Sequence, residues 1–181
     1  PAHLRALTPL FVAALSGPTE RVRLLLPAPS IDVNQATTEG GPPLYFAAAM
    51  GHTECVKLLL AAPSIDVNQA NNEGGTPLYF AAFKGHIECV RLLLAAPSID
   101  FNQANNGGAT PLSRAALNGR TECVKMLVAA PSIAVNHANT AGVPHRDGAA
   151  TGGHTGDGQT GPGERTRDAH QEDDEGGRRE A

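Results

Sequence analysis

Three cysteines are the residues of this chain best suited to chemistry, and they recur at a fixed interval. Cys55, Cys89 and Cys123 lie 34 residues apart. Zinc ligands must converge on one point, whereas residues that recur once per structural unit lie along a line. Neighbouring helices sit about 8–10 Å apart, and a disulfide needs Cα atoms within about 7 Å. The sequence therefore predicts three unpaired core cysteines that pack as small hydrophobes, and no metal site.

The histidines and carboxylates form no catalytic set either. His52 and His86 each follow a glycine, where we expect loop histidines that hydrogen-bond the backbone. Glu54 and Glu88 open predicted helices, where a carboxylate stabilises the positive end of the helix dipole. The paired glycines fall in hairpin tips rather than between a strand and a helix, so they form no phosphate-binding loop. We therefore expect no catalytic residue and no cofactor.

These residues belong to a unit of 34 residues that the chain repeats. A proline marks the same point of four successive units, at Pro9, Pro43, Pro77 and Pro111. A fixed period of about 20–50 residues is typical of a solenoid. Two helices of about ten residues each bury too little apolar surface to offset chain entropy, whereas stacked units cover one another. We therefore predict a stack of helix pairs.

The clearest unit begins at Thr76 and predicts its own helix boundaries. Thr76 caps a first helix that starts at Pro77, and Gly85 ends this helix in a left-handed conformation. A second helix over about residues 87–96 carries an apolar stripe. Pro97 ends it, because proline lacks an N–H and disfavours helix in the residue before it. A polar turn rich in Asn and Gly then leads to the next unit.

The motif of this unit is Thr76-Pro77-Leu78-Tyr79-Phe80-Ala81-Ala82, Gly85-His86, Glu88-Cys89-Val90 with Leu93-Leu94, and Asp100-Phe101-Asn102. It closely resembles the ankyrin repeat, and the resemblance covers residues 8–143 in four copies. It implies an all-α, ankyrin-type helical solenoid of helix-turn-helix repeats with hairpin loops. The period of 34 exceeds the usual length of about 33. The family's inter-repeat histidine is also replaced, by Phe11, Tyr45, Tyr79 and Ser113, and the tyrosine hydroxyls could take over its hydrogen bonds.

The repeats divide the chain into three parts. We predict an incomplete N-terminal flank at residues 1–7 and four repeats at residues 8–143, bounded 8–41, 42–75, 76–109 and 110–143. Residues 144–181 contain no Val, Ile, Leu, Met, Phe, Tyr or Trp, so we expect a disordered tail with a degenerate fifth repeat. Its acidic stretch at residues 172–175 could bind a partner, although a solvated terminus is the simpler interpretation. The chain begins without Met, and we interpret it as a fragment or processed piece.

The charge balance argues against a nucleic-acid partner. The formal net charge is −4, and residues 1–143 carry nine basic and nine acidic residues, so the whole excess lies in the tail. Nucleic acid needs a basic face. The chain has no run of 18 apolar residues, so the sequence predicts no membrane span. Unpaired thiols suit a reducing compartment. We expect an intracellular, cytoplasmic monomer, with the nucleus left open, that binds neither nucleic acid nor membrane.

The resemblance also implies a binding face. In ankyrin repeats the hairpin tips and the exposed sides of the first helices form the concave face, and here these positions vary between copies while the frame does not. Phe83 is the sharpest candidate, because aromatic residues dominate interface hot spots; alternatively it packs along Phe46 or Phe80. The predicted partner-binding residues are Thr38, Glu39, Asn72, Glu73 and Asn106 at the tips, and Leu15, Met50, Phe83, Lys84, Leu117 and Asn118 at the first-helix ends.

A candidate modification follows from the same resemblance. Asn34, Asn68 and Asn102 end triplets similar to Asp-Val-Asn. In similar proteins some hairpin asparagines are hydroxylated by an oxygen-dependent hydroxylase, and a leucine eight residues upstream fits its substrate pattern. Alternatively, each asparagine hydrogen-bonds the backbone of its own turn.

Together these features predict a non-catalytic protein–protein interaction scaffold that binds a protein partner on its concave face. An alternative is a substrate-targeting or regulatory fragment of a larger enzyme, such as a kinase or ubiquitin ligase. A third interpretation, suggested by the loss of apolar residues after Val143, is a decaying repeat gene. Repeat architecture does not identify the partner.

Overall fold

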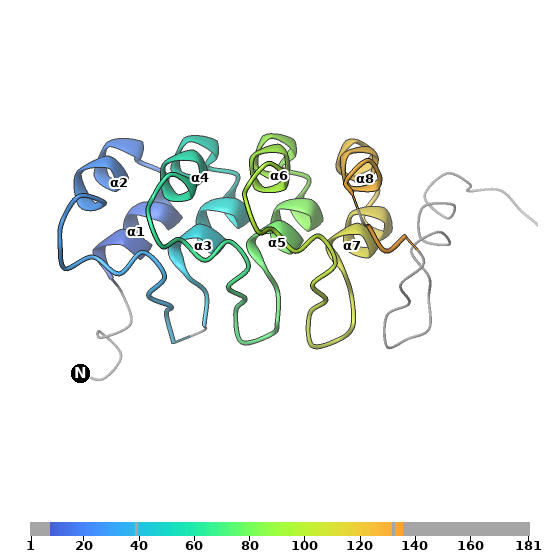
Figure 1. Cartoon of the computed structure of the whole chain (residues 1–181), viewed down its shortest axis with the longest axis horizontal. Helices are drawn as coiled ribbons and strands as arrows, with labels where there is room; N and C mark the ends of the chain where they lie inside the picture. Colours follow the sequence, from blue (N-terminus) through green and yellow to red (C-terminus); the bar gives the residue numbers. More distant parts are fainter. Residues whose placement is uncertain (1–7, 39, 132, 136–181) are drawn as a thin grey trace, which may run out of the picture.

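The computed structural model describes residues 8–38, 40–131 and 133–135. Eight helices lie in this part of the chain, and no strand does. They are α1 (Pro9–Ser16), α2 (Thr19–Leu25), α3 (Pro43–Met50), α4 (Thr53–Leu60), α5 (Pro77–Lys84), α6 (Ile87–Leu94), α7 (Pro111–Leu117) and α8 (Thr121–Val128). Figure 1 shows four helix pairs side by side, with α1, α3, α5 and α7 in one row, the second helices in another, and the hairpin loops on one edge.

This arrangement confirms the predicted all-α solenoid of helix-turn-helix repeats. The predicted N-terminal flank and C-terminal tail lie outside the described residues. The division of the chain at residues 7 and 143 therefore stays a prediction.

Each first helix begins at a proline and is capped largely as the sequence predicts. The Thr76 hydroxyl accepts a hydrogen bond from the Tyr79 N–H at 3.1 Å, which satisfies one free donor of the first turn. Gly85 ends α5 with φ +85°, a left-handed conformation that glycine adopts without steric cost. Pro42 replaces the capping threonine before α3, and no side chain caps that helix.

The second helices end earlier than predicted. The sequence predicted a helix to about residue 96, but α6 ends at Leu94. The Ala96 N–H donates to the Leu93 carbonyl at 3.0 Å, so the last turn tightens before Pro97. α2 likewise ends before its proline. A proline has no N–H with which to continue the helical hydrogen bonds; Leu26, directly before Pro27, itself keeps helical dihedrals (φ −55°, ψ −37°).

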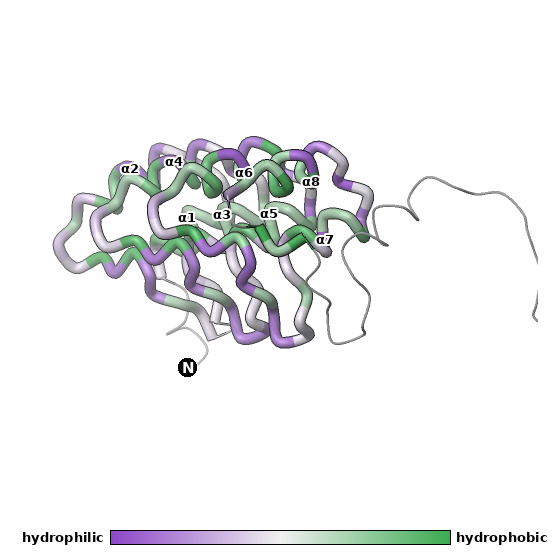
Figure 2. Tube along the Cα trace, turned by 45° about the vertical axis from the view of Figure 1, so that its right-hand side comes forward, coloured by the Kyte–Doolittle hydropathy of each residue, from purple (hydrophilic) through white to green (hydrophobic). Residues whose placement is uncertain are grey.

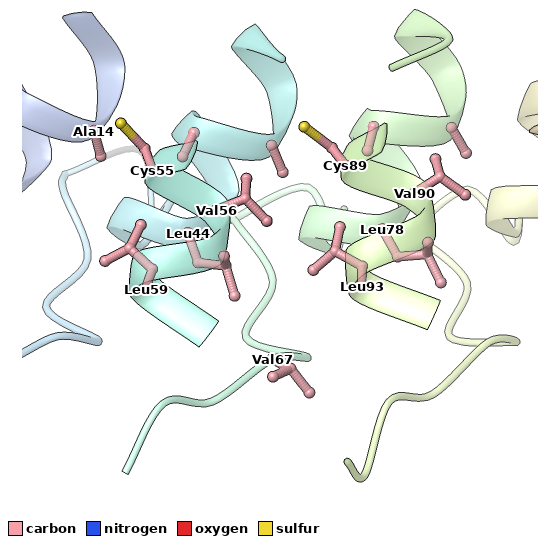
Figure 3. Packing of buried hydrophobic residues seen from close by; sticks show 14 of the residues in the cluster. Ala14, Leu44, Cys55, Val56, Leu59, Val67, Leu78, Cys89, Val90 and Leu93 are labelled. Atoms are coloured by element: carbon pink, nitrogen blue, oxygen red, sulfur yellow. The ribbon is translucent and has the colours of Figure 1, made fainter. Parts of the chain in front are cut away.

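One continuous apolar core runs through all four pairs. Leu59, Leu93 and Leu127 are fully buried and belong to the same cluster, as expected for stacked helix pairs that cover one another. Figure 3 shows Leu59 and Leu93 at equivalent places on α4 and α6. Buried alanines such as Ala48 and Ala82 lie between the rows, and their small side chains allow the helices to pack closely.

The turns that follow α3, α5 and α7 are each tied to the preceding pair. His52 Nε2 lies 3.0 Å from the Leu15 carbonyl oxygen, and His86 makes the same contact one pair further on. Both contacts confirm the prediction of loop histidines that bond the backbone. In the fourth pair Arg120 replaces histidine, and its Nε donates to the Phe83 carbonyl at 3.2 Å. These bonds cross between pairs and therefore fix the spacing of the first-helix ends.

Candidate protein-binding face

The exposed sides of α1, α3, α5 and α7, with the hairpin tips that precede them, form a surface that we call the first-helix face. Figure 2 shows hydrophobic residues along these helices and hydrophilic residues along the hairpins. Three large apolar side chains of the first helices remain exposed: Val12 at 40%, Met50 at 48% and Leu117 at 61%. Lys84 is exposed as well, whereas Leu15 and Asn118 are half-buried. The predicted first-helix contact residues therefore differ in accessibility.

An aromatic ladder crosses the first three pairs on this face. The rings of Phe11 and Phe46 meet edge to face with centroids 4.6 Å apart. Tyr45 lies 4.8 Å from both Phe46 and Phe80, and Tyr79 continues the series 5.1 Å from Phe80. Edge-to-face pairs add stabilisation beyond the area they bury. The ladder joins neighbouring pairs into a rigid floor, which sequence reasoning missed although the Tyr-Phe dipeptide repeats.

The tyrosine hydroxyls tie the helices to the hairpins. Tyr45 Oη accepts a hydrogen bond from Asn71 Nδ2 at 3.3 Å, and Tyr79 Oη accepts one from Asn105 Nδ2 at 3.1 Å. Tyr79 Oη also accepts from Arg114 Nε, in the next pair, at 2.7 Å. Of these contacts only the Tyr79–Arg114 bond joins two repeats, so replacement of the family's inter-repeat histidine by the tyrosines stays a prediction.

Phe83 lies at the end of the ladder and is half-buried. Its ring packs edge to face on Phe80 with centroids 6.2 Å apart, as the packing alternative proposed. Lys84 Nζ lies 5.1 Å from the Phe83 centroid, and Arg114 Cζ lies 5.3 Å from it. A cation within about 6 Å of an aromatic ring is attracted to its negative face. Phe83 is therefore part of the floor and also the centre of a basic cluster.

The hairpin tips hold one another in register. Asn72 Nδ2 donates to the Thr38 carbonyl at 3.0 Å, and Asn106 Nδ2 donates to the Asn72 carbonyl at 2.9 Å. The Asn106 backbone N–H also donates to the Glu73 carbonyl at 2.9 Å. The tip residues predicted as partner contacts thus have a structural role as well, while their side chains stay exposed. Glu39 lies outside the described residues.

The candidate hydroxylation sites bridge neighbouring pairs. Asn68 Oδ1 accepts from the Asp100 N–H at 2.9 Å, and Asn68 Nδ2 donates to the Ser98 carbonyl at 2.7 Å. Asn34 makes the same two contacts one pair earlier, and Asn102 Oδ1 accepts an N–H of the following loop. The interpretation in which each side chain bonds its own turn is therefore wrong. Hydroxylation itself stays a prediction.

The cysteines lie in the core and not on the first-helix face. Cys55, Cys89 and Cys123 are buried and unpaired, which confirms them as core residues. Burial raises the pKa of each thiol, so all three stay protonated at neutral pH. In the described ranges, no group of three His, Cys, Asp or Glu side chains is placed to hold a metal ion. None of the helices seen there has the length and apolarity needed to cross a membrane.

Comparison with known families agrees with this geometry. A family model described as ankyrin repeats (3 copies) matches residues 2–71 and 63–139. These matches span more than half of the chain, so the chain belongs to the ankyrin repeat family. No curated protein matches it. Ankyrin repeats are protein–protein interaction modules and are typically non-catalytic.

Proposed function

We propose that this chain is a non-catalytic scaffold that binds a protein partner on its first-helix face. The observation that carries the proposal is the row of large apolar side chains left open there. Met50 on α3 and Leu117 on α7 are 48% and 61% exposed, and Phe83, which is half-buried, belongs to the helix between them, α5. Binding energy in protein interfaces concentrates in a few such residues near the centre of the contact.

The rigidity of the face supports the same function. The aromatic ladder, the histidine contacts and the asparagine ladder of the tips all cross between pairs. A surface already fixed in its binding conformation loses little entropy on association, and more of the contact energy then appears as affinity. Met50 adds adaptability at the centre, because its unbranched side chain fits irregular surfaces.

A capture experiment with the full chain tests the proposal. The Met50→Ala/Phe83→Ala double variant and the unchanged chain are each coupled to beads, and the proteins that they retain are compared by mass spectrometry. The matched control is Ile87→Ala/Val128→Ala, since these side chains are 42% and 47% exposed on second helices. We expect the first variant to lose specific partners and the control to keep them. Equal recovery by all three proteins, with unchanged circular dichroism, would reject this face.

A further inference from the structure

The charges of the first helices are of one sign and lie at one end of the stack. Among the residues of α1, α3, α5 and α7, the only charged side chains are Lys84 and Arg114. Arg120 follows in the turn after α7. The first helices are therefore uncharged in the first two pairs and basic in the last two.

The three cations converge on one residue. Lys84 Nζ and Arg114 Cζ lie 5.1 and 5.3 Å from the Phe83 ring centroid, and Arg120 Nε donates to the Phe83 backbone carbonyl. Lys84 and Arg120 are exposed, and Arg114 is half-buried with its Nε held by Tyr79. We call Lys84, Arg114 and Arg120 around Phe83 the Phe83 cluster. Arg114 is thus oriented before any partner arrives.

Several cations of the second helices form ion pairs with a glutamate of the same helix. Arg23 pairs with Glu20 at 3.2 Å, Lys125 pairs with Glu122 at 2.7 Å, and Arg91 pairs with Glu88. None of the ion pairs found among the described residues includes a member of the Phe83 cluster. Three cations of the second helices thus have a carboxylate partner, whereas Lys84 and Arg114 on the first helices and Arg120 in the adjoining turn have none among these pairs. Like charges held close repel one another, and an arriving carboxylate would relieve that repulsion.

We propose that the Phe83 cluster selects an acidic segment of the protein partner, which deepens and rests on the function proposed above. A carboxylate of the partner pairs with the Arg114 guanidinium, whose fork matches carboxylate geometry, and Lys84 adds a second positive charge near the same ring. An apolar side chain next to that carboxylate packs on Phe83 and Leu117. Acidic and apolar residues that alternate in a short segment satisfy both requirements.

Two observations favour an acidic peptide over a nucleic acid. A phosphate backbone needs cations along its whole path, but the hairpin tips of this face carry Asn72, Glu73 and Asn106 instead of basic residues. Residues 1–143 carry nine basic and nine acidic residues, so the repeats offer a polyanion no net positive charge along its path. The basic cluster is large enough for one or two carboxylates and does not extend further.

Selection from a random 12-residue peptide library displayed on phage tests this inference without a known partner. The full chain is the bait, and the frequency of Asp and Glu in the selected peptides is compared with the input library. Lys84→Gln/Arg120→Gln removes two charges and keeps the Arg114–Tyr79 bond, and a second variant adds Arg114→Gln. The matched control, Lys57→Gln/Arg91→Gln/Lys125→Gln, removes three charges from the second helices.

We expect Asp and Glu to be enriched next to Leu, Phe or Met with the unchanged chain and the control. Each exposed ion pair contributes only modestly, so the effect is expected when all three charges are removed together. The triple cluster variant should bind a selected peptide at least about tenfold more weakly. Selected peptides without acidic enrichment, or enrichment that survives the triple variant, would overturn the inference. The proposed function would still stand if Met50→Ala/Phe83→Ala abolished the selection. A 15-residue oligothymidylate that binds as tightly as the peptides and depends on the same residues would replace the acidic peptide by a phosphate ligand.

Discussion

Substitution of Gly51 by alanine tests whether the histidine contacts hold the stack together. Gly51 ends α3 with φ +75°, and a Cβ at this position would lie 2.6 Å from Nδ1 of His86. The ring cannot move aside freely, because His86 Nε2 lies 3.1 Å from the Ala49 carbonyl oxygen. At Gly119, in contrast, φ is +64° and an added Cβ would meet no atom within 4 Å. The two glycines therefore share backbone strain but differ in the clash.

The expected costs follow from these contacts. A left-handed conformation costs a residue with a Cβ about 1 kcal/mol. Displacement of His86 loses its hydrogen bond, about 1 kcal/mol, and its packing against Gly51, about another 1 kcal/mol. We therefore expect Gly51→Ala to lower the free energy of unfolding by about 3 kcal/mol, and Gly119→Ala by about 1 kcal/mol.

Urea unfolding followed by circular dichroism at 222 nm measures both values. The decisive comparison is a double-mutant cycle, because Gly51→Ala in a His86→Ala background should cost only the backbone term of about 1 kcal/mol. The cycle keeps the position of the glycine constant, so end effects in the stack cancel. If Gly51→Ala cost the same in both backgrounds, the histidine would not be the obstacle and the reasoning would be refuted.

Three further predictions concern the end of the stack, the core thiols and the bridging asparagines. Leu24 is 77% exposed beside an apolar groove of about 450 Å³, whereas Leu58 at the equivalent position of the next pair is half-buried. In urea unfolding, Leu24→Lys should change stability by less than about 0.5 kcal/mol and Leu58→Lys should cost about 2 kcal/mol or more. Equal costs would contradict the difference in burial between the two leucines. Burial raises the pKa of Cys89 above its ordinary 9.0, so the unfolded thiol ionises first as the pH rises past 9; stability should therefore fall from that pH upward, and less so in Cys89→Val, whereas identical pH profiles would argue against it. In protein from cells that hold an asparagine hydroxylase, the peptide containing Asn68 should gain the mass of one oxygen atom, and an unchanged mass would count against modification.

Much of the fold follows from local signals in the sequence. The proline period and the capping threonines predict where the first helices begin, because both act within one turn of the chain. Gly85 and its equivalents predict where those helices end for the same reason. The ends of the second helices were less predictable, because the last helical residue before a proline can differ by one or two positions.

The sequence likewise indicated some features of the binding face and not others. Variation between the copies pointed to Met50, Lys84 and Leu117, all of which are exposed on the first-helix face. It did not indicate that the side-chain amides of Asn72 and Asn106 donate hydrogen bonds to neighbouring hairpin tips. Those bonds join residues that are 34 positions apart, and no local pattern distinguishes them from free surface asparagines.

The sequence alone thus determined the repeat, the family, the core cysteines and the backbone-bonding histidines, because each depends on periodicity or on immediate neighbours. Only the tertiary structure decided that the aromatic rings form a ladder and that Lys84, Arg114 and Arg120 meet at Phe83. The physical reason is that contacts between successive pairs depend on how one pair is displaced and rotated relative to the next. That displacement is set by the packing of the whole core, and no single repeat contains it.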